Sequence, residues 1–502
     1  MTARRLALAI VLGAAGVRIV LSGVMPLFPD EAYYWEWSRH LAAGYFDHPP
    51  GIAFVVRAGT SLFAAFDASN TTVAVRLGAV LSGLIAALAT AGIARRLAGD
   101  EAALRASIIM TVLPLAAAGL VLATPEAPAL AAVAVALYCV VAALAHQPRT
   151  RASLRWWTLT GVALGIAFVS KYTAILVPVG VVLAFALRRD LRARFTEAGP
   201  YVACVVATVI FLPVLLWNAR HNWISFTHQI QHGLGAPQGP PVMSALRHEG
   251  DYVAGQAGLA TPILFVFLVM AIARGLRRVA QAAEFVLAVV ALGYFALFMY
   301  SALRQHVEPN WPGPGYIPAI ALVAATVWGP RAATWFHAGV ALAAAVSVLV
   351  YVQAVVPILP VPPPRDPVAR AFGWEDLAHH AVADARVLTL STSHRTWLGA
   401  DRYQEAAELA FHDPDHAATF AVNLTGRANQ YDLWPRFPNV AARGDNLILV
   451  LDNTDGAHPA AAILAPHFAA VRRGDRLTLT RQGGVVGERR EWLLVGWNGG
   501  WP

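Results

Sequence analysis

The stretch Pro29-Asp30-Glu31-Ala32-Tyr33-Tyr34-Trp35-Glu36-Trp37 follows one long apolar run, residues 6–26, and precedes the next, residues 72–94. It joins adjacent acids to aromatic side chains, and a second polar motif, Gly44-Tyr45-Phe46-Asp47-His48-Pro49-Pro50, lies just behind it. An apolar run of about 20 residues is long enough to cross the hydrocarbon core of a bilayer. The arrangement therefore predicts a membrane scaffold that holds this polar stretch at one face.

The composition is typical of a polytopic membrane protein. Of 502 residues, 57% are hydrophobic and only 14% are charged, whereas a soluble chain carries about 25% charged residues. The net charge of +8 does not indicate a nucleic-acid partner, because the basic residues form short clusters between apolar runs rather than one patch with aromatics. The two cysteines, Cys139 and Cys204, lie inside apolar runs, so neither a disulfide framework nor a cysteine metal site is expected.

About eleven apolar runs qualify, or nearly qualify, as membrane spans. They are residues 6–26, 72–94, 101–119, 124–145, 156–170, 172–187, 199–217, 259–273, 284–302, 315–329 and 334–356. The first run is expected to be retained, because Val24-Met25-Pro26-Leu27-Phe28 offers no small-residue site for signal cleavage. Arginines gather in the loops that are cytoplasmic if the N-terminus is cytoplasmic, as the positive-inside rule requires. An odd number of spans then places the C-terminal part and the polar motifs outside, in the periplasm.

The proline-rich run 356–364 ends the last span, because proline cannot continue a helix. The sequence thus divides into a transmembrane domain, residues 1–357, and a small soluble α/β domain, residues 358–502. In the second domain the hydrophobic pattern predicts strands at 386–392, 418–424 and 446–452, a helix at 397–411 and a hairpin at 476–497. No glycine-rich nucleotide loop of the Rossmann or P-loop type occurs in the sequence.

The acids of the opening stretch have two interpretations. Asp30 could cap a helix over residues 31–43, with Glu31 in its first turn, while the aromatics Tyr33, Tyr34, Trp35 and Trp37 form a belt at the membrane interface. Alternatively, a carboxylate at the membrane surface could act as general base on an acceptor hydroxyl.

Two further motifs also leave alternatives open. In Asp47-His48-Pro49-Pro50, Asp47 could cap a helix that starts at Pro50, or His48 and the N–H groups of that helix start could hold a phosphate. Thr124-Pro125-Glu126 has the pattern of an ordinary helix start, although Glu126 is expected on the same face as Asp30.

Basic residues mark two more segments of the same predicted face. Lys171, in Ser170-Lys171-Tyr172, could extend toward the interface or neutralise a phosphate. Arg304, His306 and Glu308 alternate along a proline-broken segment, which favours an anion site over a simple loop.

A long outer loop begins near Asn218 and contains three histidines. His221, His228 and His232 could suggest a metal site. No acidic partners complete a ligand set in the sequence around them, so surface histidines without a metal are expected.

These motifs together resemble one family, the bacterial protein-mannosyltransferase-like superfamily, which includes the aminoarabinose transferases acting on lipid A. The motifs that carry the resemblance are Asp30–Trp35, Gly44–Pro50, Thr124–Glu126, Ser170–Tyr172, His306–Trp311 and, in the C-terminal domain, Tyr403–Leu409 and Gln430–Pro435. The motifs specify the family rather than the sugar or the acceptor. Where the aminoarabinose branch has a lysine before the double proline, this sequence has His48, which is cationic at neutral pH if its neighbour Asp47 raises its pKa.

The resemblance implies a membrane glycosyltransferase of the C-type fold in the bacterial inner membrane. It would move a sugar, with inversion, from a polyprenyl-phosphate donor to an envelope acceptor such as lipid A, lipopolysaccharide or another glycan. No cofactor is implied, and a divalent metal is left open. The roles implied are catalysis by Asp30 as base with Glu31 and Glu126; binding of the donor phosphate by His48, Lys171, Arg304 and His306; and substrate contacts by Tyr33, Tyr34, Asp47 and Glu308.

Two rival functions fit the same membrane topology. A transporter or flippase of lipid-linked sugars would place ionisable groups near the bilayer midplane and show internal repeats, whereas the unusual groups here gather at one face. An inactive relative could instead act as a scaffold for other envelope enzymes.

Overall fold

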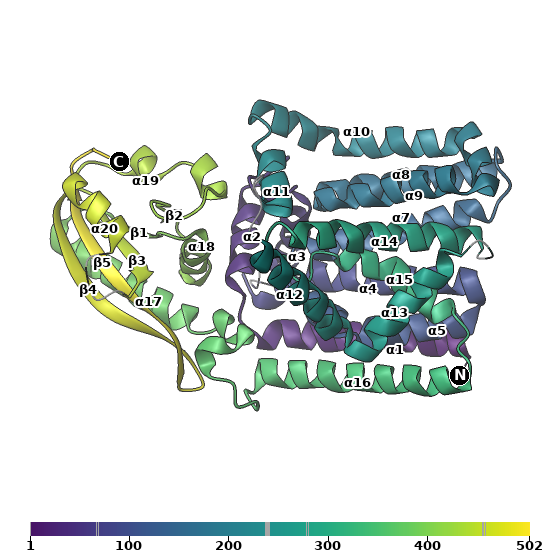
Figure 1. The fold of residues 1–502 in the computed structure, drawn as a ribbon. Coiled ribbons are helices and arrows are strands. Elements are labelled where there is room, and N and C mark those ends of the chain that lie inside the picture. Colours follow the sequence, from purple (N-terminus) through teal and green to yellow (C-terminus); the bar gives the residue numbers. More distant parts are fainter. Residues whose placement is uncertain are drawn as a thin grey trace. The chain divides into compact units, whose positions relative to one another are not determined.

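A computed structural model describes residues 2–502 except 67, 69, 236–240, 278, 280, 454, 455 and 457. The chain forms two compact units. Unit 1 comprises Met1–Gly23 and Ala42–Val352, and unit 2 comprises Val24–Leu41 and Gln353–Pro502. Unit 1 is a bundle of helices, and unit 2 combines a sheet with helices (Figure 1).

The helices of unit 1 follow one another along the chain with short connections. They are α1 (Ala3–Val24), α3 (Gly51–Ala64), α4 (Thr72–Ala98), α5 (Asp100–Val112), α6 (Pro114–Gly119), α7 (Glu126–Leu144), α8 (Arg151–Ser170), η1 (Tyr172–Ile175), α9 (Leu176–Leu187), η2 (Arg189–Thr196), α10 (Ala198–Arg220), α11 (Ile224–Leu234), α12 (Val242–Ala260), α13 (Pro262–Gly275), α14 (Ala282–Ala302), α15 (Gly313–Ala325) and α16 (Pro330–Val355). Among the described residues, seven helices are long and apolar enough to cross a membrane: α1, α4, α7, α8, α10, α14 and α16. The protein is thus a multi-pass membrane protein.

The remaining predicted runs do not form single long helices. The run 101–119 is divided between α5 and α6, because Pro114 begins a new helix. The run 259–273 lies in α13, which meets α12 at a bend of 101°. The runs 172–187 and 315–329 form shorter apolar helices. The count of eleven spans and the side on which each terminus lies stay predictions.

Glycines allow helices α8 and α10 to lie in close contact. A Cβ added at Gly161 on α8 would lie 2.6 Å from the carbonyl oxygen of Ala203 on α10, and one at Gly165 would lie 2.6 Å from Ile210 Cβ. Small residues let two membrane helices approach at backbone distance. The two helices consequently run side by side along the bundle (Figure 1).

Unit 2 is built around a mixed five-stranded sheet in the order β2-β1-β3-β5-β4. β1 pairs in parallel with both β2 and β3, whereas β5 is antiparallel to β3 and β4. The long β4–β5 hairpin is drawn in yellow in Figure 1. The strands are β1 (Thr396–Ala400), β2 (Thr419–Ala421), β3 (Asn446–Asp452), β4 (Phe468–Arg481) and β5 (Gly484–Trp497).

The helices of unit 2 differ from the sequence prediction in two places. They are α2 (Pro29–Arg39), α17 (Trp374–Thr392), α18 (Tyr403–His412), α19 (Phe437–Val440) and α20 (Pro459–Leu464), with short helices η3 (Pro363–Arg365), η4 (Pro367–Ala371), η5 (Gln430–Leu433) and η6 (Ala465–His467). The strand predicted at 446–452 and the hairpin are confirmed. The segment 386–392 is helical instead, because Leu388 continues the buried stripe of Ala381 and Ala385 on α17. The helix predicted at 397–411 begins only at Tyr403, because residues 396–400 form strand β1.

The opening stretch forms α2, which packs on α18 and so belongs to unit 2 rather than to the transmembrane domain predicted for residues 1–357. Phe28 is its N-cap residue, and Glu31 Oε2 accepts the Phe28 N–H at 3.0 Å. Asp30 is therefore not the predicted cap. Trp35 and Trp37 are buried within the protein, so they do not form the expected belt at the membrane interface.

Candidate active site

Lys171 is the only lysine in the sequence, and 6% of it is exposed. It lies in the break between α8 and η1. Its Nζ donates to Glu126 Oε1, at the start of α7, at 2.5 Å, and Asn310 Nδ2 donates to the same oxygen at 3.3 Å. An ammonium group carries three N–H donors. Among the described residues, Glu126 accepts one of these N–H groups, so Lys171 keeps N–H donors for an anion.

The pairing changes the prediction for Glu126. Pro125, not Thr124, is the N-cap residue of α7, and no side chain caps this helix start. Glu126 of the Thr124-Pro125-Glu126 motif therefore begins α7 and also forms an ion pair with the buried Lys171. The signal that sequence reasoning missed is the single lysine in a chain whose other fixed cations are arginines.

Asp47 and His48 lie in the loop before α3, and both contact helix α11 within unit 1. Gln229 Nε2, on α11, donates to the Asp47 main-chain oxygen at 2.6 Å and lies 3.2 Å from His48 Nδ1. His228 Nε2 lies 3.7 Å from Asp47 Oδ1. Asp47 does not cap α3, whose N-cap residue is Pro50. An aspartate oxygen and an imidazole nitrogen at this separation could also serve as two ligands of a divalent cation.

His48 is neutral at physiological pH. Burial is the main cause that lowers its pKa, to about 4, and the Lys171 ammonium acts in the same direction; Asp47 and Glu126 act in the opposite direction and are outweighed. The prediction of a positive charge on His48 is therefore wrong. The imidazole is a neutral hydrogen-bonding group, and Lys171 supplies the positive charge of this cluster.

Lowering the pH is expected to destabilise the protein through His48. The folded residue stays neutral down to about pH 4, whereas an unfolded histidine takes up a proton near about pH 6.5. The unfolded state therefore binds the proton first, and stability falls as the pH drops through this window. Between about pH 7.5 and about pH 5, the free energy of unfolding of His48→Gln should fall by on the order of 1–2 kcal/mol less than that of the wild type. Thermal unfolding of the full chain in detergent measures this, and equal losses would contradict it.

Gly51 permits a close approach between the His48 loop and the segment that holds Lys171. A Cβ at Gly51, the first residue of α3, would lie 2.7 Å from Ser170 Cα and 2.7 Å from Ser170 Oγ. The Ser170 backbone cannot move aside as the end of a flexible side chain could. The double proline followed by glycine thus positions α3 directly against the residue before Lys171.

Gly51→Ala is expected to push α3 away from Ser170 and to reduce both stability and function. Overpacking of a tight contact costs about 1–3 kcal/mol. Gly16→Ala, in α1, is the matched control, because nothing lies within 4 Å of its added Cβ. Thermal unfolding of both variants measures the effect. An equal or higher melting temperature for Gly51→Ala than for Gly16→Ala would refute the contact.

The segment after α14 reaches the Lys171 cluster through Asn310, which donates to Glu126 Oε1, while the recorded contacts of its basic residues lie elsewhere in unit 1. Arg304 Nε donates to Leu234 O at 2.7 Å, and its NH1 donates to Tyr300 at 3.4 Å. His306 and Glu308 face each other at 3.8 Å, and both are more than half exposed. The donor-phosphate roles of Arg304 and His306, and the substrate role of Glu308, stay predictions.

A mostly apolar cavity of about 240 Å³ lies beside Glu126 in unit 1. Asn310 and Thr124 contribute polar groups to its wall. The remaining lining is aliphatic or aromatic and comes from Met110, Leu115, Leu120, Leu130, Ile317 and Tyr316, among others. A hydrocarbon lining suits an apolar chain, and one of the lining residues, Glu126, is the ion-pair partner of Lys171.

Asp30 lies in unit 2 and lines a polar cavity of about 490 Å³. The carboxylate is exposed, and Tyr403 Oη and Gln404 Nε2 lie 3.4 and 3.5 Å from its Oδ1. Three guanidinium groups line the same cavity, from Arg370, Arg402 and Arg489. The cavity therefore places the exposed Asp30 carboxylate in a wall of mixed charge, in which Arg402 and Arg489 pair with Asp452 and Glu405.

The other predicted residues of the opening stretch have structural contacts in unit 2. Tyr33 Oη accepts the Gln430 N–H at 2.7 Å, and its ring stacks on Tyr431. Tyr34 is buried and packs edge-on against Trp37. These contacts join the opening motif to the C-terminal motif that contains Gln430 and Tyr431, and Glu31 fixes the start of α2.

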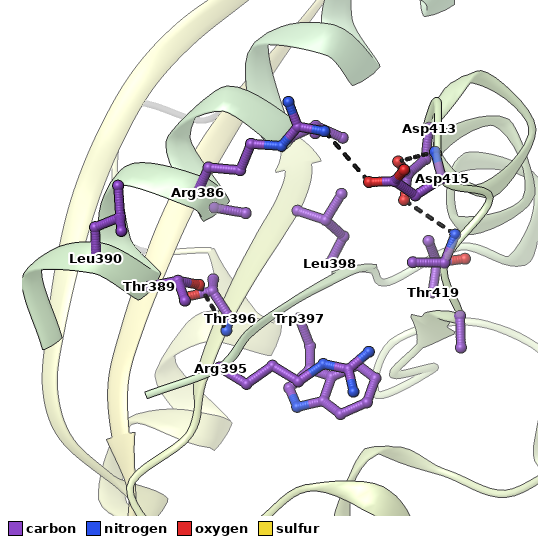
Figure 2. Close-up of a pocket in the computed structure, with 14 residues that line it drawn as sticks. Arg386, Thr389, Leu390, Arg395, Thr396, Trp397, Leu398, Asp413, Asp415 and Thr419 are labelled. Carbon is purple, nitrogen blue, oxygen red and sulfur yellow. Dashed lines mark hydrogen bonds and ion pairs between the residues drawn. The ribbon is translucent and has the colours of Figure 1, made fainter. Parts of the chain in front are cut away.

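A further cavity of unit 2, of about 390 Å³, was not predicted from the sequence. It lies between α17, β1 and the loop before β2 (Figure 2). Arg386 and Asp415 form an ion pair at 3.3 Å on its wall, and Leu390 and Leu398 supply apolar surface. It contains none of the predicted site residues.

Comparison with known proteins supports the motif-based resemblance. Residues 47–217 match the family described as dolichyl-phosphate-mannose-protein mannosyltransferase. Over 327 residues the chain is 30% identical to the lipid A galacturonosyltransferase RgtD of Rhizobium johnstonii, a match that covers 64% of this chain and 65% of that protein.

Similarity to solved structures extends over nearly the whole chain. ArnT from Cupriavidus metallidurans in the apo state has a TM-score of 0.63 at 18% identity and 97% coverage of both chains. The same protein bound to undecaprenyl phosphate has a TM-score of 0.62 at 18% identity and 98% coverage of both. Archaeal AglB from Archaeoglobus fulgidus has a TM-score of 0.52 at 11% identity, over 89% of this chain and 69% of that one. The predicted resemblance is confirmed: this multi-pass membrane chain has the C-type glycosyltransferase fold, and its residues 47–217 match the dolichyl-phosphate-mannose-protein mannosyltransferase family.

Proposed function

We propose that the protein transfers a sugar from a polyprenyl-phosphate donor to an envelope lipid, on the periplasmic face of the bacterial inner membrane. The observation that carries the proposal is the buried Lys171–Glu126 pair beside a hydrocarbon-lined cavity. A single fixed cation with donors to spare suits the phosphate of a lipid, and the apolar lining suits its isoprenoid chain. The ArnT structure with undecaprenyl phosphate shows that this fold accommodates such a lipid.

In the proposed reaction the donor carries its own leaving group, a phosphate on a polyprenyl chain. Lys171 would stabilise the negative charge that develops on this phosphate as the bond to the sugar breaks. His48, being neutral, would contribute a hydrogen bond rather than a charge. Glu126 would hold the ammonium in position through their ion pair.

The acceptor side of the reaction is assigned to the polar cavity of unit 2. Asp30 would take the proton of an acceptor hydroxyl as that oxygen attacks the anomeric carbon, and this single displacement inverts the anomeric centre. The guanidinium groups of Arg370 and Arg402 would bind an anionic headgroup, because planar guanidinium groups match phosphate oxygens. Glu31 is left out of the catalytic role because its carboxylate serves the start of α2.

Lipid A is the proposed acceptor and galacturonic acid the sugar to be tested first. Both come from the relative named a lipid A galacturonosyltransferase. A lipid A headgroup carries phosphates, which fits the arginine-lined cavity. Other envelope glycans are the alternative acceptors.

The proposal is tested by mass spectrometry of envelope lipids from a strain that lacks this gene. Loss of a sugar from lipid A, restored by the wild-type gene but not by Lys171→Met, is expected. Unchanged envelope lipids would contradict transfer, and accumulation of the lipid-linked sugar on the cytoplasmic side would indicate a flippase instead.

A further inference from the structure

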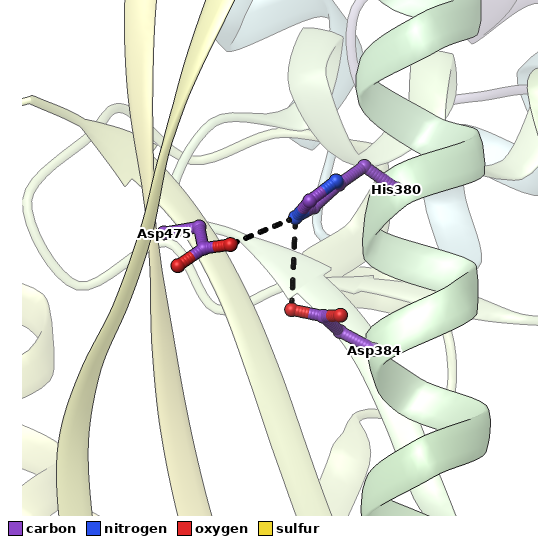
Figure 3. Close-up of side chains that lie close together, drawn as sticks. All are labelled: His380, Asp384 and Asp475. Atoms are coloured by element: carbon purple, nitrogen blue, oxygen red, sulfur yellow. Dashed lines mark ion pairs between the residues drawn. The ribbon is translucent and has the colours of Figure 1, made fainter.

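A histidine and two acids of unit 2 point toward one another between α17 and the β4–β5 hairpin (Figure 3). His380 and Asp384 are one helical turn apart on the same face of α17. Asp475 approaches from β4. One ligand atom from each of the three residues lies within 4.8 Å of the others.

The distances in this cluster fit shared coordination better than hydrogen bonding. His380 Nε2 lies 3.4 Å from Asp475 Oδ2 and 3.7 Å from Asp384 Oδ2, both longer than the usual N–H···O distance of about 2.9–3.0 Å. His380 Nε2 accordingly has no hydrogen-bond partner among the described residues. Atoms about 2.0–2.2 Å from a common cation lie at such separations from each other.

A third acid, Glu491 of β5, is the independent observation that points to a ligand. Its side chain is 0% exposed, and within the described chain neither carboxylate oxygen has a hydrogen-bond partner. Asp384 and Asp475 are its acidic neighbours. An unpaired buried carboxylate facing two other acids requires a positive charge or a proton to offset it.

The backbone of the hairpin is shaped so that these groups converge. The β4–β5 pairing shifts register between Arg473 and Arg476, which places Gly474 and Asp475 in a bulge. A Cβ at Gly474 would lie 3.0 Å from Glu491 Cβ. Bulges commonly redirect a side chain out of the regular alternation of a strand. Here the bulge carries Asp475, and Glu491 occupies the neighbouring strand.

We propose that His380, Asp384 and Asp475 bind one divalent cation that accepts mixed nitrogen and oxygen ligands, such as Zn²⁺, and that the buried Glu491 carboxylate adds negative charge beside them. One imidazole and two carboxylates provide three protein ligands, which leaves the fourth position of a tetrahedral zinc site to water. The cation would fix α17 to the β4–β5 hairpin. This site goes beyond the proposed glycosyl transfer and does not depend on it.

Access and alternatives both favour a cation over a shared proton. Asp475 has 72% of its side chain exposed, so ions can enter from solution. A proton shared between Glu491 and Asp384 would neutralise one charge, but it would leave His380 Nε2 only at ion-pair distance from the two aspartates, 3.4 and 3.7 Å. A cation would bind His380, Asp384 and Asp475 at once and offset the charge of Glu491.

Zinc binding by the full-length protein in detergent tests the site. The protein is treated with a chelator, desalted and titrated with Zn²⁺ by calorimetry, and bound zinc is counted by elemental analysis. His380→Ala and Asp475→Asn should each bind one equivalent less than the wild type. Thermal unfolding should show a zinc-dependent rise in melting temperature for the wild type that both variants lack.

His379→Ala is the matched control, because His379 is the exposed neighbour of His380 on α17. It should keep the wild-type zinc stoichiometry and the zinc-dependent stabilisation. Stoichiometry and stabilisation that are the same in His380→Ala, Asp475→Asn and His379→Ala would overturn the site. Asp475 is largely exposed, so Asp475→Asn decides the question even if His380→Ala does not fold.

Discussion

Lys171→Met is expected to lower the rate of sugar transfer by at least about 100-fold, the usual loss when one preorganised group at the developing charge is removed. The chain has no second lysine that could take over. Lys171→Arg should not restore the rate, because a guanidinium is larger and planar and does not replace a compact ammonium at a buried position. The measurement is the initial rate of transfer by membranes that contain equal amounts of each variant.

The effect of Lys171 on function can be separated from its effect on folding. Lys171→Met leaves Glu126 buried and unpaired, which costs about 3–5 kcal/mol. The double variant Lys171→Met/Glu126→Gln removes both charges, so its thermal stability should recover while transfer stays lost. Arg247→Met, at a side chain that is 83% exposed, is the control and should behave as the wild type. Recovery of transfer in the double variant would reduce the pair to a structural role.

Asp30→Asn is expected to lower kcat by about 10²–10⁴-fold, the range for loss of a general base, with little change in KM for the acceptor. Asp30 is exposed, so the fold should be kept. Arg370→Ala, in the same cavity, should instead raise KM for the acceptor. Asp251→Asn, at a side chain 53% exposed, is the matched control. An Asp30→Asn enzyme with near-wild-type kcat would exclude this residue as the base.

The membrane architecture could be predicted from the sequence because apolar length alone determines it. Seven of the predicted runs are the long helices of the bundle. The short runs were ambiguous for a physical reason. A stretch such as 101–119 is apolar throughout, yet Pro114 divides it into two helices, and apolar content does not report that break.

The association of the opening stretch with the C-terminal domain could not be predicted. Tyr33 and Trp35 have the composition of a membrane-interface belt, and only tertiary contacts with residues such as Tyr431 and Phe411 show that they are core residues of unit 2. Such contacts join residues nearly 400 positions apart, which no local pattern encodes.

The candidate site was predicted in its residues but not in its charges. The motifs identified Glu126, Lys171 and His48, and the structure adds that the first two are paired. The charge of His48 depends on burial, which lowers its pKa. Asp47 beside it in the sequence suggested the opposite shift. The sequence neighbour Asp47 therefore predicted the wrong direction of the pKa shift, because desolvation by burial is the larger effect.

The most direct test of the account uses the purified full-length protein reconstituted in liposomes with undecaprenyl-phosphate-linked galacturonic acid and lipid A. Mass spectrometry should show lipid A that carries an added hexuronic acid, together with released undecaprenyl phosphate, for the wild type and the Arg247→Met control. Lys171→Met and Asp30→Asn should give no product above background. Product formation at wild-type rates by Lys171→Met, or no consumption of any polyprenyl-phosphate sugar by the wild type, would contradict the account.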